Sequence, residues 1–247
     1  MRRTALVALV AAGAALGACA YNETLGRNQF LLVGDSALTQ QADAAWAEAL
    51  RTQRVSSDAA ANARVRRVGE RIVQAAGLTD RRWEYAVFVS ESPNAFVLPS
   101  GKIGVTTGLL SLVRNDDQLA AVLGHEVGHV VAQHAAERYS QTAATSAGLG
   151  ILQGAAGDYA QAAGAIGGLG AQLGVLLPFS RRHELEADRL GVDYLQRAGY
   201  RPSEAIALWR LMAQQRQGSN PEFASTHPSD ASRISALEQY IQSQGWG

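Results

Sequence analysis

The chain has 247 residues, of which 47% are hydrophobic, so it can bury a core as one large domain or two small ones. This content excludes an intrinsically disordered chain. Lysine plus arginine equals aspartate plus glutamate at 22 each. This balance predicts no nucleic-acid partner, because such a partner favours an excess of basic residues.

The N-terminus has the pattern of a secretion signal. A short basic start precedes an apolar run at 5–16, and LGAC at 16–19 ends it. We expect residues 1–18 to be a signal peptide, too short to span a bilayer comfortably. The ending resembles a bacterial lipoprotein box, in which cleavage before Cys19 is followed by lipidation of its thiol. An ordinary cleaved signal that contains a cysteine is the alternative.

The lipoprotein resemblance implies a tether outside the cytoplasm. Ala20 follows the cysteine, which by resemblance favours the outer membrane, with the protein in the periplasm. Residues 19–35 are then expected to form the lipidated tether. Cys19 is the only cysteine, so the chain can form no internal disulfide and depends on its core for stability.

Hydrophobic periodicity and capping residues predict a mostly helical α+β protein. Apolar residues spaced by three and four indicate two opening helices, and a β-branched and aromatic run follows them. A Pro-Ser-Gly turn joins two short strands. The expected elements are helices at 36–54 and 57–76, strands at 83–90, 95–98 and 102–107, and helices at 115–139, 181–198, 203–217 and 229–243.

Residues 143–177 are rich in glycine and alanine, and each glycine weakens a helix by roughly 1 kcal/mol relative to alanine. Two interpretations are open. The segment is either a mobile, loosely helical hairpin that acts as a lid or membrane-facing surface, or a closely packed helix pair without a functional role. Since no linker interrupts the rest, residues 36–247 are expected to form a single domain.

The stretch LGHEVGHVVAQH at 123–134 contains His-Glu-x-x-His within an expected helix. Four residues turn an α-helix by about 400°, so His125 and His129 project from one face and can share a metal ion. Catalytic zinc takes three protein ligands and leaves a position for water. Glu126 beside that water can act as the general base. His134 is expected at the surface, at the end of the helix.

A third ligand is expected from RRHELEADRLG at 181–191. Glu184 and Asp188 stand one helical turn apart and face the same way. Glu184 can reach the zinc, while Asp188 accepts a hydrogen bond from the far nitrogen of a ligand histidine. We expect Glu186 to be solvated or in a surface ion pair. His183 lies about 100° round the helix from Glu184 and is not expected to bind metal.

Three segments together resemble the M48 family of zinc metallopeptidases, in particular its periplasmic lipoprotein and quality-control members. They are HEVGH, ELEAD, and NAFVLPSGKIGVTTGLL at 94–110. The resemblance extends over roughly 64–237. It implies a zincin-like gluzincin domain with a small β-sheet packed on the His-Glu-x-x-His helix.

The same resemblance assigns roles at the metal. It implies one zinc ion per chain, bound by His125, His129 and Glu184. Glu126 would be the catalytic base, and Asp188 a supporting acid.

A further segment, THPSDASRI at 226–234, resembles the family's HP-x-x-x-x-RI sequence, which lies near the metal. His227 is therefore expected to stabilise the reaction's oxyanion or to occupy the open zinc position in a resting form. A loop histidine beside a helix-starting proline is the alternative. Arg233 becomes a candidate partner for Asp188 or for the substrate carbonyl.

Peptidases of this type hold the substrate as an extra strand on a sheet edge, because backbone hydrogen bonds bind any extended chain. The two short strands before the metal helix are the expected edge. An ordinary core hairpin is the alternative, and both can hold together. The expected substrate-binding residues are Asn94, Ala95, Phe96, Gly104 and Val105.

These features predict a zinc-dependent endopeptidase that cleaves unfolded or misfolded envelope proteins with zinc-activated water. The alternative is a lipid-anchored chaperone or scaffold in which His227 closes the metal site and little proteolysis occurs. Glu126 favours catalysis, because a structural zinc with four ligands needs no base. A metal-dependent lipase or amidase would use the same ligands.

Overall fold

A computed structural model describes much of the chain. The signal peptide expected at 1–18 lies outside the described residues, as does most of the glycine- and alanine-rich segment. The described residues are 19–154, 179–215, 223, 226–227 and 231–246, of which 35, 146–154 and 215 are described by backbone alone.

A three-stranded sheet forms beside the metal-motif helix. It contains β3 (Glu84–Phe88), β4 (Ala95–Leu98) and β5 (Lys102–Thr106) in the order β3-β5-β4. β5 runs parallel to β3 and antiparallel to β4. The predicted turn between β4 and β5 is present, and Gly101 has a φ of 80° there, a conformation that glycine adopts without steric cost.

Helices make up most of the rest of the described chain, so the expected mostly helical α+β class is confirmed. α4 was not predicted. None of the described helices is long and apolar enough to cross a membrane. The helices are α2 (Asp35–Thr52), α3 (Ala59–Ala75), α4 (Thr107–Leu112), α5 (Asp116–Val131), α6 (His134–Gly154), α8 (Arg181–Arg197), α9 (Ser203–Gln215) and α11 (Ala231–Ser243).

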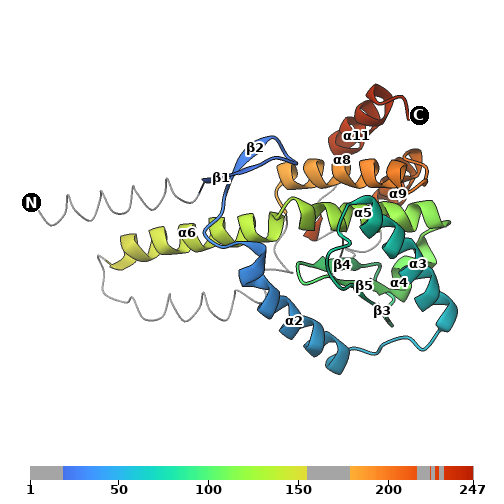
Figure 1. Cartoon of the computed structure of the whole chain (residues 1–247), viewed down its shortest axis with the longest axis horizontal. Helices are drawn as coiled ribbons and strands as arrows, with labels where there is room; N and C mark the ends of the chain where they lie inside the picture. The colour runs from blue at the N-terminus through green and yellow to red at the C-terminus, as the bar shows by residue number, and fades with distance from the viewer. Residues whose placement is uncertain (1–18, 155–178, 216–222, 224–225, 228–230, 247) are drawn as a thin grey trace, which may run out of the picture.

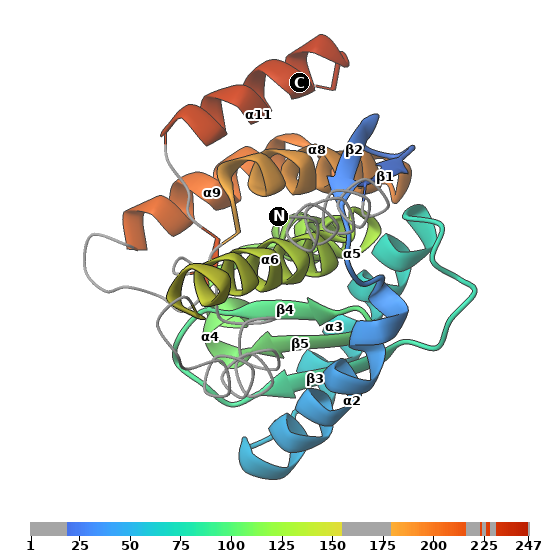
Figure 2. The same cartoon turned by 90° about the vertical axis from the view of Figure 1, so that its left-hand side faces the viewer.

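The sheet is covered on both faces, because successive side chains of a strand point to opposite faces and apolar residues occupy both. On β3, Val87 joins the main core formed with α3 and α5, while Phe88 points to the other face. There Phe88 meets Trp46 of α2 and Phe96 of β4, with ring centroids 5.8 Å and 6.0 Å away. Figures 1 and 2 show α5 between this sheet and α8. The metal-motif helix is therefore the central element.

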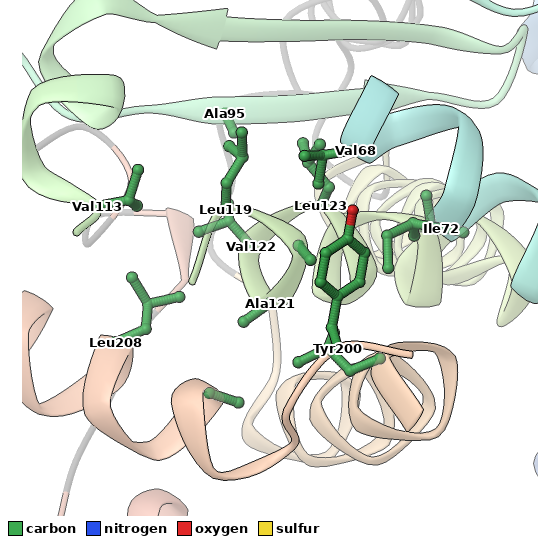
Figure 3. Close-up of a cluster of buried hydrophobic side chains, with 14 of the residues drawn as sticks. Val68, Ile72, Ala95, Val113, Leu119, Ala121, Val122, Leu123, Tyr200 and Leu208 are labelled. Carbon is green, nitrogen blue, oxygen red and sulfur yellow. The ribbon is translucent and has the colours of Figure 1, made fainter. Parts of the chain in front are cut away.

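The main core surrounds α5. Leu119, Val122 and Leu123 of this helix are fully buried. Figure 3 shows them between side chains from β4 and α3 and the side chains Tyr200 and Leu208. Because apolar residues occupy nearly the whole circumference of α5, its polar motif residues lie in a dry environment.

The N-terminal part of the described chain is a two-stranded antiparallel hairpin, which was not predicted from the sequence. Its strands are β1 (Cys19–Asn22) and β2 (Arg27–Phe30), and Cys19 pairs with Phe30. Figure 1 shows it beside α8 and the start of α6. Gln29 is only 2% exposed. Residues 19–35 thus include a segment that packs on the domain; their role as a lipidated tether stays a prediction.

The helix predicted at 115–139 is two helices. Its start is as expected, since the Asn115 side chain accepts a hydrogen bond from Gln118 N. α5 ends at Val131, and Gln133 has a φ of 53°, in the left-handed region. α6 then starts at His134 in a new direction. This change of direction decides where His134 lies.

Candidate metal centre

The motif residues occupy the buried middle of α5. His125, Glu126 and His129 are 1%, 4% and 5% exposed. The histidines point the same way, as their spacing predicts, and their Nε2 atoms lie 3.1 Å apart. Two buried imidazole nitrogens at this distance are candidates for binding one ion.

Glycine allows α8 to approach α5 closely. A Cβ atom at Gly124 would lie 3.0 Å from the carbonyl oxygen of Gly191, and one at Gly128 would lie 2.9 Å from that of Ala187. Side chains at these positions would push the helices apart. Glycine at these positions therefore allows the close packing of α5 and α8.

This approach brings the two predicted acids of α8 to the histidines. Glu184 Oε1 lies 3.4 Å from His129 Nε2, and Asp188 Oδ1 lies 3.0 Å from His125 Nδ1. Glu184 thus lies beside the Nε2 atoms of His125 and His129, whereas Asp188 lies beside Nδ1, the outer nitrogen of His125. The structure places both acids as the sequence predicts.

Four potential ligands converge at this point. Ligand atoms of His125, His129, Glu184 and His227 all lie within 4.8 Å of one another. If His125 Nδ1 donates to Asp188, its Nε2 presents a lone pair toward His129 and Glu184, so the donor set repels itself unless a cation separates its members. Two nitrogen ligands of tetrahedral zinc lie about 3.4 Å apart, close to the 3.1 Å between these atoms. The donor set fits zinc.

His227 is the fourth member of this set. Its Nδ1 lies 3.0 Å from Glu184 Oε1 and 3.2 Å from His125 Nε2. Its Nε2 lies 3.3 Å from Glu126 Oε1. His227 is 4% exposed. It therefore lies between the other three donors and the predicted base, Glu126. Both of its expected roles would place it there.

Arg233 of α11 neutralises the acids of α8. Its Nε lies 2.5 Å from Asp188 Oδ2, and its Nη1 lies 2.5 Å from Glu184 Oε2. Arg233 is 2% exposed. Burial works against the charged form of Asp188, but Arg233 outweighs it and lowers the pKa of that carboxyl. The expected pairing with Asp188 is present, and the contact with Glu184 was not predicted.

The electrostatics of Glu126 suit a base. Burial raises the pKa of its carboxyl above the ordinary value, and the neighbouring His227 and His125 oppose the rise. A raised pKa makes a carboxylate a better proton acceptor.

A pocket opens beside this centre, between the motif and the sheet. Its wall includes Glu126, His129 and His227 together with the whole of β4. The full lining is Asn94, Ala95, Phe96, Val97, Leu98, Pro99, Glu126, His129, Val130, Ala135, Phe179, Thr226 and His227. Three of the expected substrate-binding residues, Asn94, Ala95 and Phe96, therefore line it.

The other two expected substrate-binding residues, Gly104 and Val105, do not lie on a sheet edge, so this prediction was wrong. β5 is the central strand, so Gly104 and Val105 are paired on both sides. Val105 is fully buried. A Cβ atom at Gly104 would lie 2.3 Å from the ring of Phe96. Gly104 therefore makes room for Phe96 and does not form an edge.

A continuous helix predicted that His134 would lie at the surface. This prediction was wrong, because His134 is fully buried. On an unbroken helix it would lie about 140° round from His129. Because the chain turns at Gln133, its Nδ1 instead lies 2.9 Å from His129 Nδ1. No pattern in the sequence signals this turn.

Glu186 forms the expected surface ion pair, with the exposed Arg182, but it has further partners that were not predicted. Its side chain is 16% exposed and pairs with His134 and with Arg27 of the hairpin, whose side chain is 9% exposed. The distant Arg27 could not be foreseen. His183 lies outside the donor set, as expected, with its Nε2 3.3 Å from Glu137. Cys19 is an exposed free thiol in β1; its lipidation stays a prediction.

Comparisons with known proteins are consistent with this centre. A family model described as Peptidase family M48 matches residues 59–241. Mitochondrial metalloendopeptidase OMA1 of Schizosaccharomyces pombe is 41% identical over 179 residues, which cover 72% of this chain and 52% of that protein. Metalloprotease LoiP of Escherichia coli is 29% identical over 161 residues, which cover 65% of this chain and 64% of that protein.

A third relative is the Beta-barrel assembly-enhancing protease of Escherichia coli. It is 29% identical over 176 residues, which cover 68% of this chain and 36% of the relative. The chain spans about half the length of the relative from Schizosaccharomyces pombe and less of this one.

Proposed function

Because the chain belongs to peptidase family M48, we propose that it is a zinc metalloendopeptidase that cleaves unfolded or extended polypeptides. Metallopeptidases of this family are zinc-dependent, and the buried donor set suits that ion. The observation that carries the proposal is that one pocket is lined by two members of this donor set, His129 and His227, by the buried Glu126 and by a strand.

Each residue of the centre has a role that follows from its position. His125, His129 and Glu184 would hold the zinc, which supplies Lewis-acid activation of water when bound. Asp188 orients His125 through its outer nitrogen. Glu126 accepts the proton of the attacking water and passes it to the leaving amine.

The sheet supports the expected mode of substrate binding. One outer side of β3 is covered, since Ser56 N donates to Val87 O and Val89 N donates to Arg54 O. β4 pairs only with β5 among the described strands, and its residues line the pocket. An extended substrate can add to this edge by backbone hydrogen bonds, which select for unfolded chain more than for sequence.

The proposed location follows from the N-terminus. The lipoprotein-like signal and the exposed thiol of Cys19 support a tether on the outer membrane, facing the periplasm. Misfolded envelope proteins would then be the substrates. The Escherichia coli relatives named above are in keeping with a bacterial protease, whereas the OMA1 relatives are named as mitochondrial.

Cleavage of an unfolded model protein tests the proposal. The full chain in detergent, with zinc, is compared with Glu126→Gln and with Glu48→Gln, a surface control. Wild type and Glu48→Gln should give the same fragments by mass spectrometry, and Glu126→Gln should give none while still binding one zinc. Fragments from Glu126→Gln at the wild-type rate would refute the role of Glu126.

The alternative is a chaperone or scaffold with a closed metal site, and the position of His227 in the donor set is the observation that favours it. No fragments from any variant would support either this function or an enzyme held closed by His227. His227→Ala separates the two, since it should release proteolysis only from a closed enzyme.

A further inference from the structure

The outer nitrogen of His129 has an unexpected partner. Its Nδ1 lies 2.9 Å from Nδ1 of His134, and both rings are buried. Two ring nitrogens at this distance share one proton, since two lone pairs or two protons would repel each other. Because His129 Nε2 faces the donor set, its proton lies on Nδ1, and His134 Nδ1 is the acceptor.

The other nitrogen of His134 fixes this arrangement. Its Nε2 lies 3.0 Å from Glu186 Oε2. A neutral imidazole with an accepting Nδ1 carries its proton on Nε2, so it donates to the carboxylate. Glu186, His134 and His129 thus form a continuous line of hydrogen bonds that ends at the donor set.

Glu186 is held by the N-terminal hairpin. Arg27 Nε and Nη2 contact the two oxygens of Glu186, each at 2.7 Å. The same guanidinium contacts Glu137 of α6 twice at 2.8 Å. Gln29 donates to Glu137 and to the carbonyl oxygen of Ala132, at the turn before His134. The hairpin therefore holds Glu186 and the turn that precedes His134.

Packing alone does not account for this line of contacts. Phe179 stacks on His129, with ring centroids 3.9 Å apart, and His183 stacks on His134 at 4.3 Å. Stacking sets the plane of a ring, but it does not select which nitrogen carries the proton. A hydrogen-bond acceptor at Nδ1 of His129 holds the ring proton there and leaves the lone pair of Nε2 free for a metal.

We propose that His134 is a positioning residue for metal binding by His129, and that Arg27 of the hairpin holds it in place through Glu186. The inference rests on the proposed zinc site. Partners of this kind change metal affinity about 10–100-fold when removed. The N-terminal hairpin is then part of the support of the metal centre.

The first test observes the protons directly. The zinc-loaded full chain, labelled with 15N in its five histidines, is studied by NMR, with rings assigned through single variants. We expect the proton of His129 on Nδ1 and that of His134 on Nε2. A proton on Nδ1 of His134 would overturn the proposal, and this measurement needs no variant of His134 to fold.

The second test measures zinc affinity by competition with a chelator. His134→Leu removes the acceptor and should bind zinc about 10–100-fold more weakly than wild type. His134→Asn, whose side-chain oxygen stands near the place of Nδ1, should recover part of the loss. Equal affinity of wild type and a folded His134→Leu would overturn the proposal, as would failure of His134→Asn to bind better than His134→Leu.

A matched pair of arginines tests the hairpin. Arg27 and Arg182 both contact Glu186, but the Arg182 side chain is 63% exposed against 9% for Arg27. Arg27→Gln should weaken zinc binding several-fold, and Arg182→Gln should leave it unchanged; equal values would refute the role of Arg27. Absence of zinc binding by wild type would instead refute the proposed function itself.

Discussion

The two histidines of the motif are supported in different ways. His125 contacts the carboxylate of Asp188, which pairs with the buried Arg233 of α11. His129 contacts a neutral ring, that of His134, and the charges of Glu186 and Arg27 stand one residue further away. One ligand thus depends on direct charge, and the other depends on a turn in the chain and on the hairpin.

The largest effect is expected where this direct charge is removed. Arg233→Met would leave Asp188 and Glu184 buried without their shared partner, at a cost of about 3–5 kcal/mol in the free energy of unfolding. Urea unfolding of the zinc-free protein measures it. Zinc should reduce the loss, because the ion neutralises Glu184. A loss below about 1 kcal/mol would mean that the charged support is not stronger than an exposed ion pair.

A second change acts on both histidines together, through the contact of α5 with α8. A methyl group at Gly128 would meet the carbonyl oxygen of Ala187, so Gly128→Ala should lower the free energy of unfolding by about 1–3 kcal/mol. Gly34→Ala is the control for steric contact, since a Cβ atom there would have no neighbour closer than 4.0 Å. Gly34 is the N-cap of α2, so any loss in this variant measures the cap alone. Stability equal to wild type in Gly128→Ala would show that the helices can separate without loss.

A smaller change isolates the hydrogen bond to His125. Asp188→Asn keeps the shape but replaces the carboxylate, and the amide no longer favours a proton on His125 Nδ1. We expect zinc affinity to fall about 10–100-fold in a chelator competition. The zinc affinities of Asp188→Asn and His134→Asn can then be compared. Both variants introduce asparagine, one at the support of His125 and the other at the support of His129. Unchanged affinity would indicate that His125 needs no carboxylate.

The smallest expected effect on stability is at Glu137, which the hairpin contacts, and this effect depends on pH. Burial opposes the charge of Glu137, but hydrogen bonds from His183, Arg27 and Gln29 prevail and lower the pKa of this carboxyl. Its charged form therefore stabilises the fold above the ordinary glutamate pKa of about 4.3, and this contribution is lost as the pH falls below it.

Glu137→Gln removes that contribution. Wild type should exceed the variant in free energy of unfolding by roughly 1 kcal/mol at about pH 7, and the difference should shrink by about pH 3. Urea unfolding across this range measures it. A difference that grows in acid would contradict the assigned pKa direction.

The charged support of His125 was accessible from the sequence, and that of His129 was not. Helical spacing places His125, His129, Glu184 and Asp188 on facing surfaces, because a regular helix fixes the direction of each side chain. The predicted helices and strands recur with small shifts at their ends, except the helix predicted at 115–139, which is divided in two at Gln133.

The support of His129 depends on features that have no local pattern. Gln133 adopts a left-handed conformation without being glycine, so an uninterrupted helix was the natural prediction. Arg27 reaches Glu186 across 159 positions of sequence. The order of the strands was equally hidden, and this is why Gly104 and Val105 were assigned to the edge.

The turn at Gln133 also bears on the order in which the centre assembles. His129 and His134 are five positions apart, whereas Asp188 and Arg233 reach His125 across 63 and 108 positions. Local contacts close at little cost in chain entropy and tend to form early, and distant ones form late. The contact between His129 and His134 is thus expected to form before α8 brings Glu184 and Glu186 to it, and a chain that is still folding lacks the carboxylate that completes the metal site. Such an order would protect a newly made protease from cutting its own unfolded copies.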